Sequence, residues 1–104
     1  MLIARGVAVA LATDINPGAG FSPSMPFAMT LACFSMQMTL EEALLAATLN
    51  AAWSVDRAGH AGSLETGKVM DAVIVNGGLG ELIRVGSSAI RMVVKRGNVV
   101  VPTR

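Results

Sequence analysis

The first part of the chain is a continuous apolar run that ends abruptly in a polar turn. Residues 7–12 are apolar at every position, without the alternation of a strand that has one exposed face. A strand that is buried on both faces, as in a parallel sheet covered by helices, has this pattern. Asp14 and a Pro-Gly turn at 17–18 follow almost at once. We therefore expect a buried strand at 7–12 that delivers polar side chains into a loop.

The next apolar stretch predicts a helix from about Met25 to Met36. Ser24 suits the N-cap position, and Pro26 falls in the first turn, where its missing N–H costs little. A spacing of i, i+4 and i+7 predicts a core face made of Phe27, Leu31 and Phe34. The methionines of this stretch are interpreted as adaptable core fillers rather than as a binding surface.

A second helix is predicted from Leu40 to about Val55. Thr39 and Glu42 have the spacing of a capping box, in which each side chain bonds to the other residue's backbone N–H. The predicted apolar side of this helix comprises Leu44, Leu45, Ala47, Thr48 and Ala51. Asn50 lies near the helix end in an apolar context, and we interpret it as a side chain that satisfies a nearby backbone group.

The last part of the chain predicts short strands and turns. Residues 69–75 read as a strand that Asp71 interrupts, and residues 90–95 and 98–101 flank Arg96-Gly97. Two apolar runs around a two-residue turn with glycine in its second position predict a β-hairpin.

The chain thus changes character near residue 57, from helix and buried strand to short strands. The fold class is α/β, and we expect two parts, residues 1–57 and residues 58–104. One parallel strand is not a sheet, and the later strands are too few to cover two apolar helices. The chain is therefore expected to be incomplete by itself.

Composition points the same way. The chain has 104 residues, of which 53% are hydrophobic and only 14% are charged, well below the roughly 25% charged residues of a typical soluble domain. A chain of this length has much surface for its volume and should need more polar cover. We expect it to pack against copies of itself or to be part of something larger.

Net charge, cysteine content and the length of the apolar runs argue against nucleic-acid-binding, membrane-spanning and disulfide-bonded secreted proteins. The net charge is +1, and no aromatic residues are interleaved with the basic residues near the end of the chain, so a nucleic-acid partner is not expected. No apolar run reaches the roughly 18 residues that span a membrane. Cys33 is the only cysteine and is interpreted as a small core residue. With no signal peptide and no paired cysteines, a cytoplasmic location is expected.

Asp14 is the first candidate for chemistry. Its carboxylate could bind a metal or act as a general base, or it could only brace the turn, and the residues themselves leave both possibilities open. Asn16 could donate to a substrate, and Gly18 would let a ligand approach the backbone. His60 and Cys33 are far from Asp14 in sequence, and His60 is interpreted as a surface residue.

Four motifs, in chain order, resemble the C-terminal portion of the metal-dependent amidohydrolase superfamily. Residues 6–14 are similar to its last barrel strand with the Thr-Asp ending, and residues 38–52 to the helix that follows. Residues 62–75 and 93–100 resemble its return into a small β-sandwich and the closing hairpin. The resemblance implies the last strand–helix part of a (β/α)8 barrel plus a C-terminal β-sandwich segment.

Within the superfamily, residues 13–18 are most similar to the imidazolonepropionase family. This resemblance implies that Asp14 is a catalytic residue and a ligand of zinc or iron. It also implies that Asn16, Gly18 and Ala19 contact the substrate, although Ala19 lacks the hydroxyl group common at its position. The implied reaction is hydrolysis of the cyclic amide 4-imidazolone-5-propanoate to N-formimino-L-glutamate in histidine degradation.

The superfamily's His-x-His motif and its later metal histidines have no match in these residues. The resemblance therefore implies that this chain alone is inactive, binds no metal by itself, and needs the remainder of the barrel or copies of itself as a partner. Two alternatives stay open. One is a truncated, non-catalytic homo-oligomer that descends from an amidohydrolase, and the other is a different amidohydrolase, similar to a deaminase or a dihydroorotase.

Overall fold

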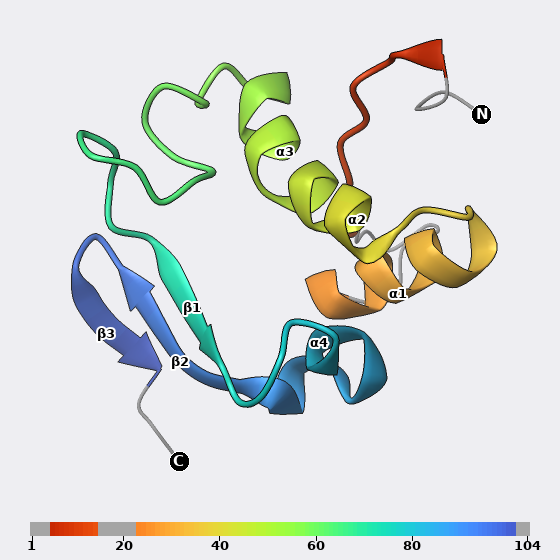
Figure 1. The fold of residues 1–104 in the computed structure, drawn as a ribbon. Coiled ribbons are helices and arrows are strands. Elements are labelled where there is room, and N and C mark those ends of the chain that lie inside the picture. Colours follow the sequence, from red (N-terminus) through yellow and green to blue (C-terminus); the bar gives the residue numbers. More distant parts are fainter. Residues whose placement is uncertain (1–4, 15–22, 102–104) are drawn as a thin grey trace.

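The computed structural model describes residues 5–14 and 23–101. Its elements are α1 (Met25–Ser35), α2 (Leu40–Ala47), α3 (Leu49–Ser54), β1 (Ala72–Val75), α4 (Glu81–Arg84), a 3-10 helix η2 (Gly86–Ala89), β2 (Ile90–Lys95) and β3 (Asn98–Val101). In Figure 1, α1, α2 and α3 lie together on one side and the sheet lies on the other, with α4 below α1. The first three helices thus precede the strands in the chain and lie apart from them, whereas α4 and η2 connect β1 to β2.

Both predicted helix starts are confirmed. Ser24 accepts a hydrogen bond from the backbone N–H of Phe27 at 3.3 Å, with a proline in the first turn of α1. At the start of α2, the Thr39 hydroxyl accepts from the Glu42 N–H at 3.1 Å, and the Glu42 carboxylate accepts from the Thr39 N–H at 2.9 Å. Each cap satisfies backbone donors that a helix start leaves without partners.

The predicted single helix after Thr39 is wrong, because the structure divides it into α2 and α3. The break is at Thr48, whose backbone angles (φ −118°, ψ −88°) are not helical. The Thr48 hydroxyl donates to the Leu44 carbonyl at 2.7 Å. A side-chain bond of this kind competes with the helical pattern of backbone bonds and bends helices.

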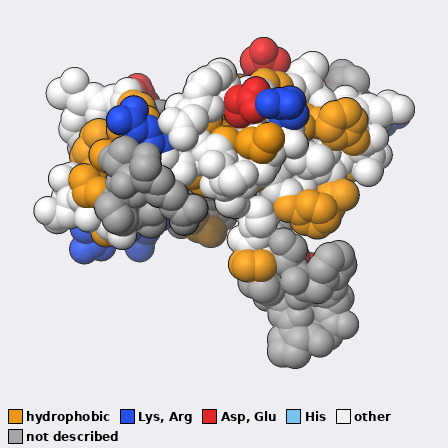
Figure 2. Space-filling view, turned by 90° about the horizontal axis from the view of Figure 1, so that it is seen from below, with side chains coloured by type: hydrophobic (Ala, Val, Ile, Leu, Met, Phe, Trp, Pro, Cys, Tyr) orange, Lys and Arg blue, Asp and Glu red, His pale blue; other side chains and the backbone are white. Residues whose placement is uncertain are grey.

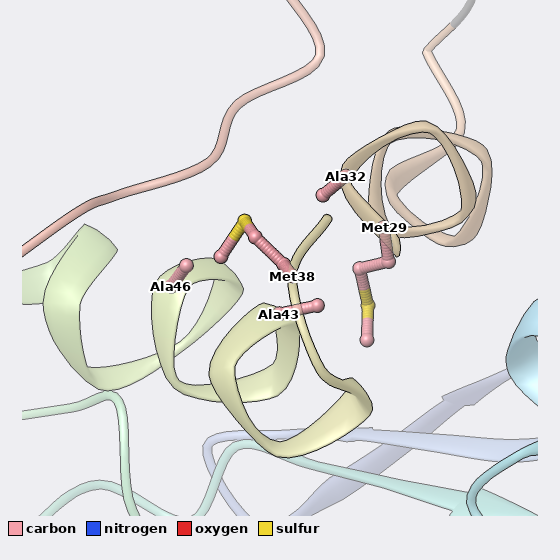
Figure 3. Packing of buried hydrophobic residues seen from close by; sticks show 5 residues of the cluster. All are labelled: Met29, Ala32, Met38, Ala43 and Ala46. Atoms are coloured by element: carbon pink, nitrogen blue, oxygen red, sulfur yellow. The ribbon is translucent and has the colours of Figure 1, made fainter. Parts of the chain in front are cut away.

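The buried core lies between α1 and α2 and consists of small and flexible side chains. Its members are Met29, Ala32, Met38, Ala43 and Ala46. Figure 3 shows that Met38, from the connection between the two helices, points toward Ala46, while Met29 lies beside Ala43. Alanine lets two helices approach closely, so this core is tight but small. Cys33 packs half-buried at its edge, in agreement with the prediction for that residue.

The predicted core face of the first helix is wrong, and that of the second helix is confirmed only in part. Phe27, Leu31 and Phe34 were expected to be buried, but their exposed fractions are 41%, 41% and 78%. The buried residues of α1 are instead Pro26, Met29 and Ala32. In α2 the fully buried positions are Ala43 and Ala46. Of the predicted face, Leu44 and Ala47 pack half-buried against the core, whereas Leu45 is half exposed.

The strands form a three-stranded antiparallel sheet in the order β1-β2-β3. The β2–β3 hairpin is confirmed, and both turn residues have positive φ (Arg96 51°, Gly97 82°). A type I′ turn needs this backbone conformation at both central positions, and glycine adopts it readily. The Asp71 carboxylate holds this turn from the chain that leads into β1. It accepts from Lys95 Nζ at 2.8 Å and from the Arg96 N–H at 2.9 Å.

The loop between α3 and β1 passes close to α3 at Gly62. A Cβ atom at this position would lie 2.8 Å from the Cβ of Ala52 and 3.2 Å from the Thr48 carbonyl oxygen, and φ is +95°. Glycine is therefore required both for space and for backbone conformation. Farther along the loop, Lys68 contacts Ser63 and Glu65. None of the described helices is long and apolar enough to cross a membrane.

Candidate functional site

Asp14 ends a segment that contains no strand. The prediction of a strand at 7–12 is wrong in this structure, since none of these residues pairs with a strand. A strand is defined by backbone bonds to a neighbouring strand. Here the neighbours are helices: the Leu11 N–H donates to the Ala46 carbonyl at 2.8 Å, and Asn50 Nδ2 donates to the Val9 carbonyl at 3.0 Å.

The position of Asp14 follows from these contacts. Leu11 also packs against the buried cluster between α1 and α2, so the segment is held by an apolar side chain as well as by two hydrogen bonds. Asp14 comes three residues later, with an exposed side chain. Its φ of 52° lies in the left-handed region, which aspartate tolerates better than most residues. The carboxylate therefore follows directly after a well-anchored stretch.

The other predicted site residues are not described. Asn16, Gly18 and Ala19 lie outside the described ranges, and their substrate contacts stay a prediction. His60 is exposed in the loop after α3, as predicted, and Cys33 is half-buried in α1. Among the described residues, no three side chains of the types His, Cys, Asp and Glu gather into a possible metal site. Asp14 supplies one carboxylate, a ligand that zinc and iron accept, without a full set.

The resolved pKa shifts belong to the second half of the chain. Hydrogen bonds from Lys95 and from the Arg96 N–H hold the pKa of the Asp71 carboxyl below its ordinary value. Hydrogen bonds from Ser63 and Lys68 likewise lower the pKa of the Glu65 carboxyl. Both groups are bound to side chains and backbone of loops and the hairpin, so these shifts indicate structural roles.

The role of Asn50 was predicted from the sequence, but its link to the segment that carries Asp14 was not. The expectation that its side chain satisfies a backbone group is confirmed, and the structure adds that this group is Val9, in the segment that carries Asp14. The role of the Ala46 carbonyl was missed. The only signal for it would have been an end of α2 near residue 47, because a backbone acceptor leaves no trace in side-chain identity.

Comparison with known proteins defines the protein family. The sequence matches the amidohydrolase family over residues 1–102. The chain therefore belongs to the amidohydrolase family, which is generally metal-dependent.

Individual relatives narrow the comparison. The imidazolonepropionase of Geobacillus thermodenitrificans is 47% identical over 102 residues, which cover 96% of this chain and 24% of that protein. The imidazolonepropionase of Geobacillus kaustophilus is 56% identical over 75 residues, covering 72% and 18%. The chain spans about a quarter of the length of the first of these relatives.

Solved structures support the fold. Guanine deaminase of E. coli superposes with a TM-score of 0.77 at 22% identity, covering 97% of this chain and 29% of that protein. An uncharacterized protein gives a TM-score of 0.62 at 25% identity, over 76% of this chain. At this level of identity the first likeness concerns the fold alone. It fits a part of an amidohydrolase barrel, while the β-sandwich assignment for residues 58–104 stays a prediction.

Proposed function

We propose that this chain is the C-terminal portion of an imidazolonepropionase-like amidohydrolase. The observation that carries the proposal is the match to imidazolonepropionases across nearly the whole chain, at 47% identity to one of them. The proposed reaction is hydrolysis of the cyclic C–N bond of 4-imidazolone-5-propanoate to N-formimino-L-glutamate. The anchored segment that ends in Asp14 supports the proposal, because it gives the chain one exposed carboxylate on a fixed support.

Asp14 would be the residue of this chain closest to the chemistry. Bound zinc or iron lowers the pKa of a coordinated water toward neutrality. The Asp14 carboxylate would serve as one metal ligand, orient the attacking water and accept its proton. Asn16 and Gly18 would contact the substrate, and Ala19 would contribute no hydroxyl bond. Since one carboxylate is not a site, the isolated chain is proposed to hold no metal tightly and to be inactive.

A hybrid enzyme tests this proposal. This chain would replace the matching segment of the Geobacillus thermodenitrificans imidazolonepropionase, and hydrolysis of 4-imidazolone-5-propanoate and metal content would be measured. We expect an active, metal-containing hybrid. Asp14→Asn should lower kcat by about 10²- to 10⁴-fold, the usual range for losing a general base, and should lower the metal content.

Asp56→Asn is the matched control. Asp56 is also exposed and also has a positive φ, of 60°, but it lies in the loop after α3. A folded hybrid without metal and activity would contradict the proposal. So would equal activities for the Asp14 and Asp56 variants.

A second candidate is a non-catalytic homo-oligomer. The observation in its favour is the number of large hydrophobic side chains that the chain exposes, among them Phe34 at 78% and Trp53 at 74%. Copies of the chain could cover them. Size-exclusion chromatography of the 104-residue chain tests this second candidate. A stable oligomer of defined size favours it, whereas tightly bound metal in the chain would contradict it.

A further inference from the structure

The segment that carries Asp14 is bound to the helices through one of its edges. Successive residues of an extended chain direct their backbone polar groups to opposite sides, so alternate residues share an edge. The Val9 carbonyl and the Leu11 N–H are such a pair, and both bond to the helical part of the chain. Figure 1 shows residues 5–14 running as an uncoiled trace past α3 and α2.

One of the two anchors comes from a helix end. Ala46 lies in the last turn of α2, where carbonyl groups lack a partner within the helix. The break at Thr48 thus leaves an acceptor that the Leu11 N–H fills at 2.8 Å. This bond joins two backbone groups, so only a proline at position 11, which would also restrict the backbone, could remove its donor.

The other anchor is a side chain. Asn50 lies in the first turn of α3, and its half-buried amide donates to a carbonyl 41 residues earlier in the chain. Among the described residues, the Asn50 side chain forms its hydrogen bond with the Val9 carbonyl. Of the two hydrogen bonds that hold this segment, the one from Asn50 is therefore the one that a conservative side-chain substitution can remove.

The short distance along the chain between the anchored residues and Asp14 connects the Asn50 hydrogen bond to the candidate site. Asp14 lies three positions after Leu11, and three extended residues span at most about 10 Å. With Val9 and Leu11 fixed, the carboxylate is confined to a small region. If the segment detaches from Asn50, Asp14 gains freedom that a metal ligand must lose on binding.

We propose that Asn50 is a positioning residue for Asp14, acting through the Val9 carbonyl. The proposal rests on the proposed function in one respect, namely that Asp14 is a metal ligand. Asn50 itself touches neither substrate nor metal in this scheme. Its role is to hold the segment so that the carboxylate is in place before the metal binds.

The first measurement is amide hydrogen exchange at Leu11 in the 104-residue chain. Asn50→Asp keeps the size of the side chain but replaces the donor with an oxygen that repels the Val9 carbonyl. We expect protection of the Leu11 amide to fall roughly 2- to 12-fold, the equivalent of losing one typical hydrogen bond. Protection in the β2–β3 hairpin should stay unchanged.

Ser54→Ala is the matched control. Ser54 is also in α3 and also donates to a carbonyl, that of Ala51 at 2.7 Å, but the bond stays within its own helix. Its loss should leave the Leu11 amide as protected as in the wild type. Equal exchange at Leu11 in the Asn50 and Ser54 variants would overturn the proposal.

The second measurement is zinc affinity of the hybrid enzyme described above. Asn50→Asp should weaken zinc binding by about 10- to 100-fold, the usual effect of losing a support behind a metal ligand, whereas Ser54→Ala should not. An unchanged zinc affinity together with unchanged exchange at Leu11 refutes the positioning role. If the wild-type hybrid binds neither zinc nor iron, the proposed function fails, and exchange at Leu11 alone then decides whether Asn50 anchors the segment.

Discussion

Asp71 links the entry of β1 to the tip of the hairpin through both of its carboxylate oxygens. One oxygen accepts from Lys95 Nζ and the other from the Arg96 N–H, beside the two positive-φ residues of the turn. The Gly97 N–H adds a bond to the Met70 carbonyl at 2.9 Å. A residue that appeared in the sequence only as an interruption of a strand therefore closes a turn about 25 positions away.

We expect the stability of the hairpin region to depend on pH through Asp71. Its pKa is lowered in the folded chain, so its contribution is fully present above the ordinary carboxyl pKa of about 3.9 and is lost as the pH falls through the lowered pKa. Urea midpoints of the wild type and of Asp71→Asn should differ most near neutral pH and converge at low pH.

The Lys95→Gln variant provides the control for that measurement. If Asp71 acts through Lys95, the coupling between the two substitutions in a double-mutant cycle should shrink as the pH is lowered. A difference between wild type and Asp71→Asn that is constant from neutral to acidic pH would refute this role of the carboxylate.

At the scale of elements, α1 shows why periodicity alone misplaced a core face. The helix is apolar on nearly every side, with Thr30 and Ser35 as its few polar residues. A helix of this kind has no single apolar stripe, so several faces fit the pattern equally well. The spacing of the large side chains suggested one face, but α2 packs on the other, where Met29 and Ala32 allow a closer approach.

Paired substitutions on α1 test this packing. Met29→Ala removes a side chain that is only 3% exposed and should cost about 2–5 kcal/mol in unfolding free energy. Phe34→Ala removes a larger side chain that is 78% exposed and should change stability by no more than about 0.5 kcal/mol. Urea unfolding of both variants measures the difference, and a greater loss for Phe34→Ala would mean that α1 packs through the predicted face.

Elements defined by near neighbours were predicted well. The caps at Ser24 and Thr39 and the turn at Arg96-Gly97 depend on residues within four positions of each other, and the structure contains all three. The end of α2 was missed because no glycine or proline marks it. The break shows in the backbone angles of Thr48, whose hydroxyl bonds to the Leu44 carbonyl.

At the scale of the whole molecule, most of what was mispredicted involves distant contacts. Residues 7–12 have the composition of a buried strand, yet their backbone partners are helix residues some forty positions away. The chain belongs to the amidohydrolase family, and its fold fits part of an amidohydrolase barrel. The role of Asp14 in the candidate site stays a prediction. The satisfied amide of Asn50 is confirmed, but no local sequence pattern could connect Asn50 to the segment that carries Asp14.

The exposure of many large hydrophobic side chains is also a property of the whole molecule. Figure 2 shows hydrophobic side chains in several separate groups on one face, and the described residues include large exposed side chains on all three of the first helices, such as Leu31, Leu45 and Trp53. No large side chain among the described residues is fully buried. The composition predicted that the chain has more hydrophobic side chains than it can bury, whereas only the structure shows which faces expose them.

The long-range bond between Asn50 and Val9 has a consequence for the order of folding. Helices α1 and α2 are neighbours in sequence and can pack after closing a short connection, whereas the anchor must close a loop of about 40 residues. Longer loops lose more entropy on closure, and non-local contacts form later. We therefore expect pulse-labelling during refolding to detect protection of the Ala43 amide before that of Leu11, and simultaneous protection would contradict this order. The carboxylate of Asp14 would then reach its place last, on a helical support that is already built.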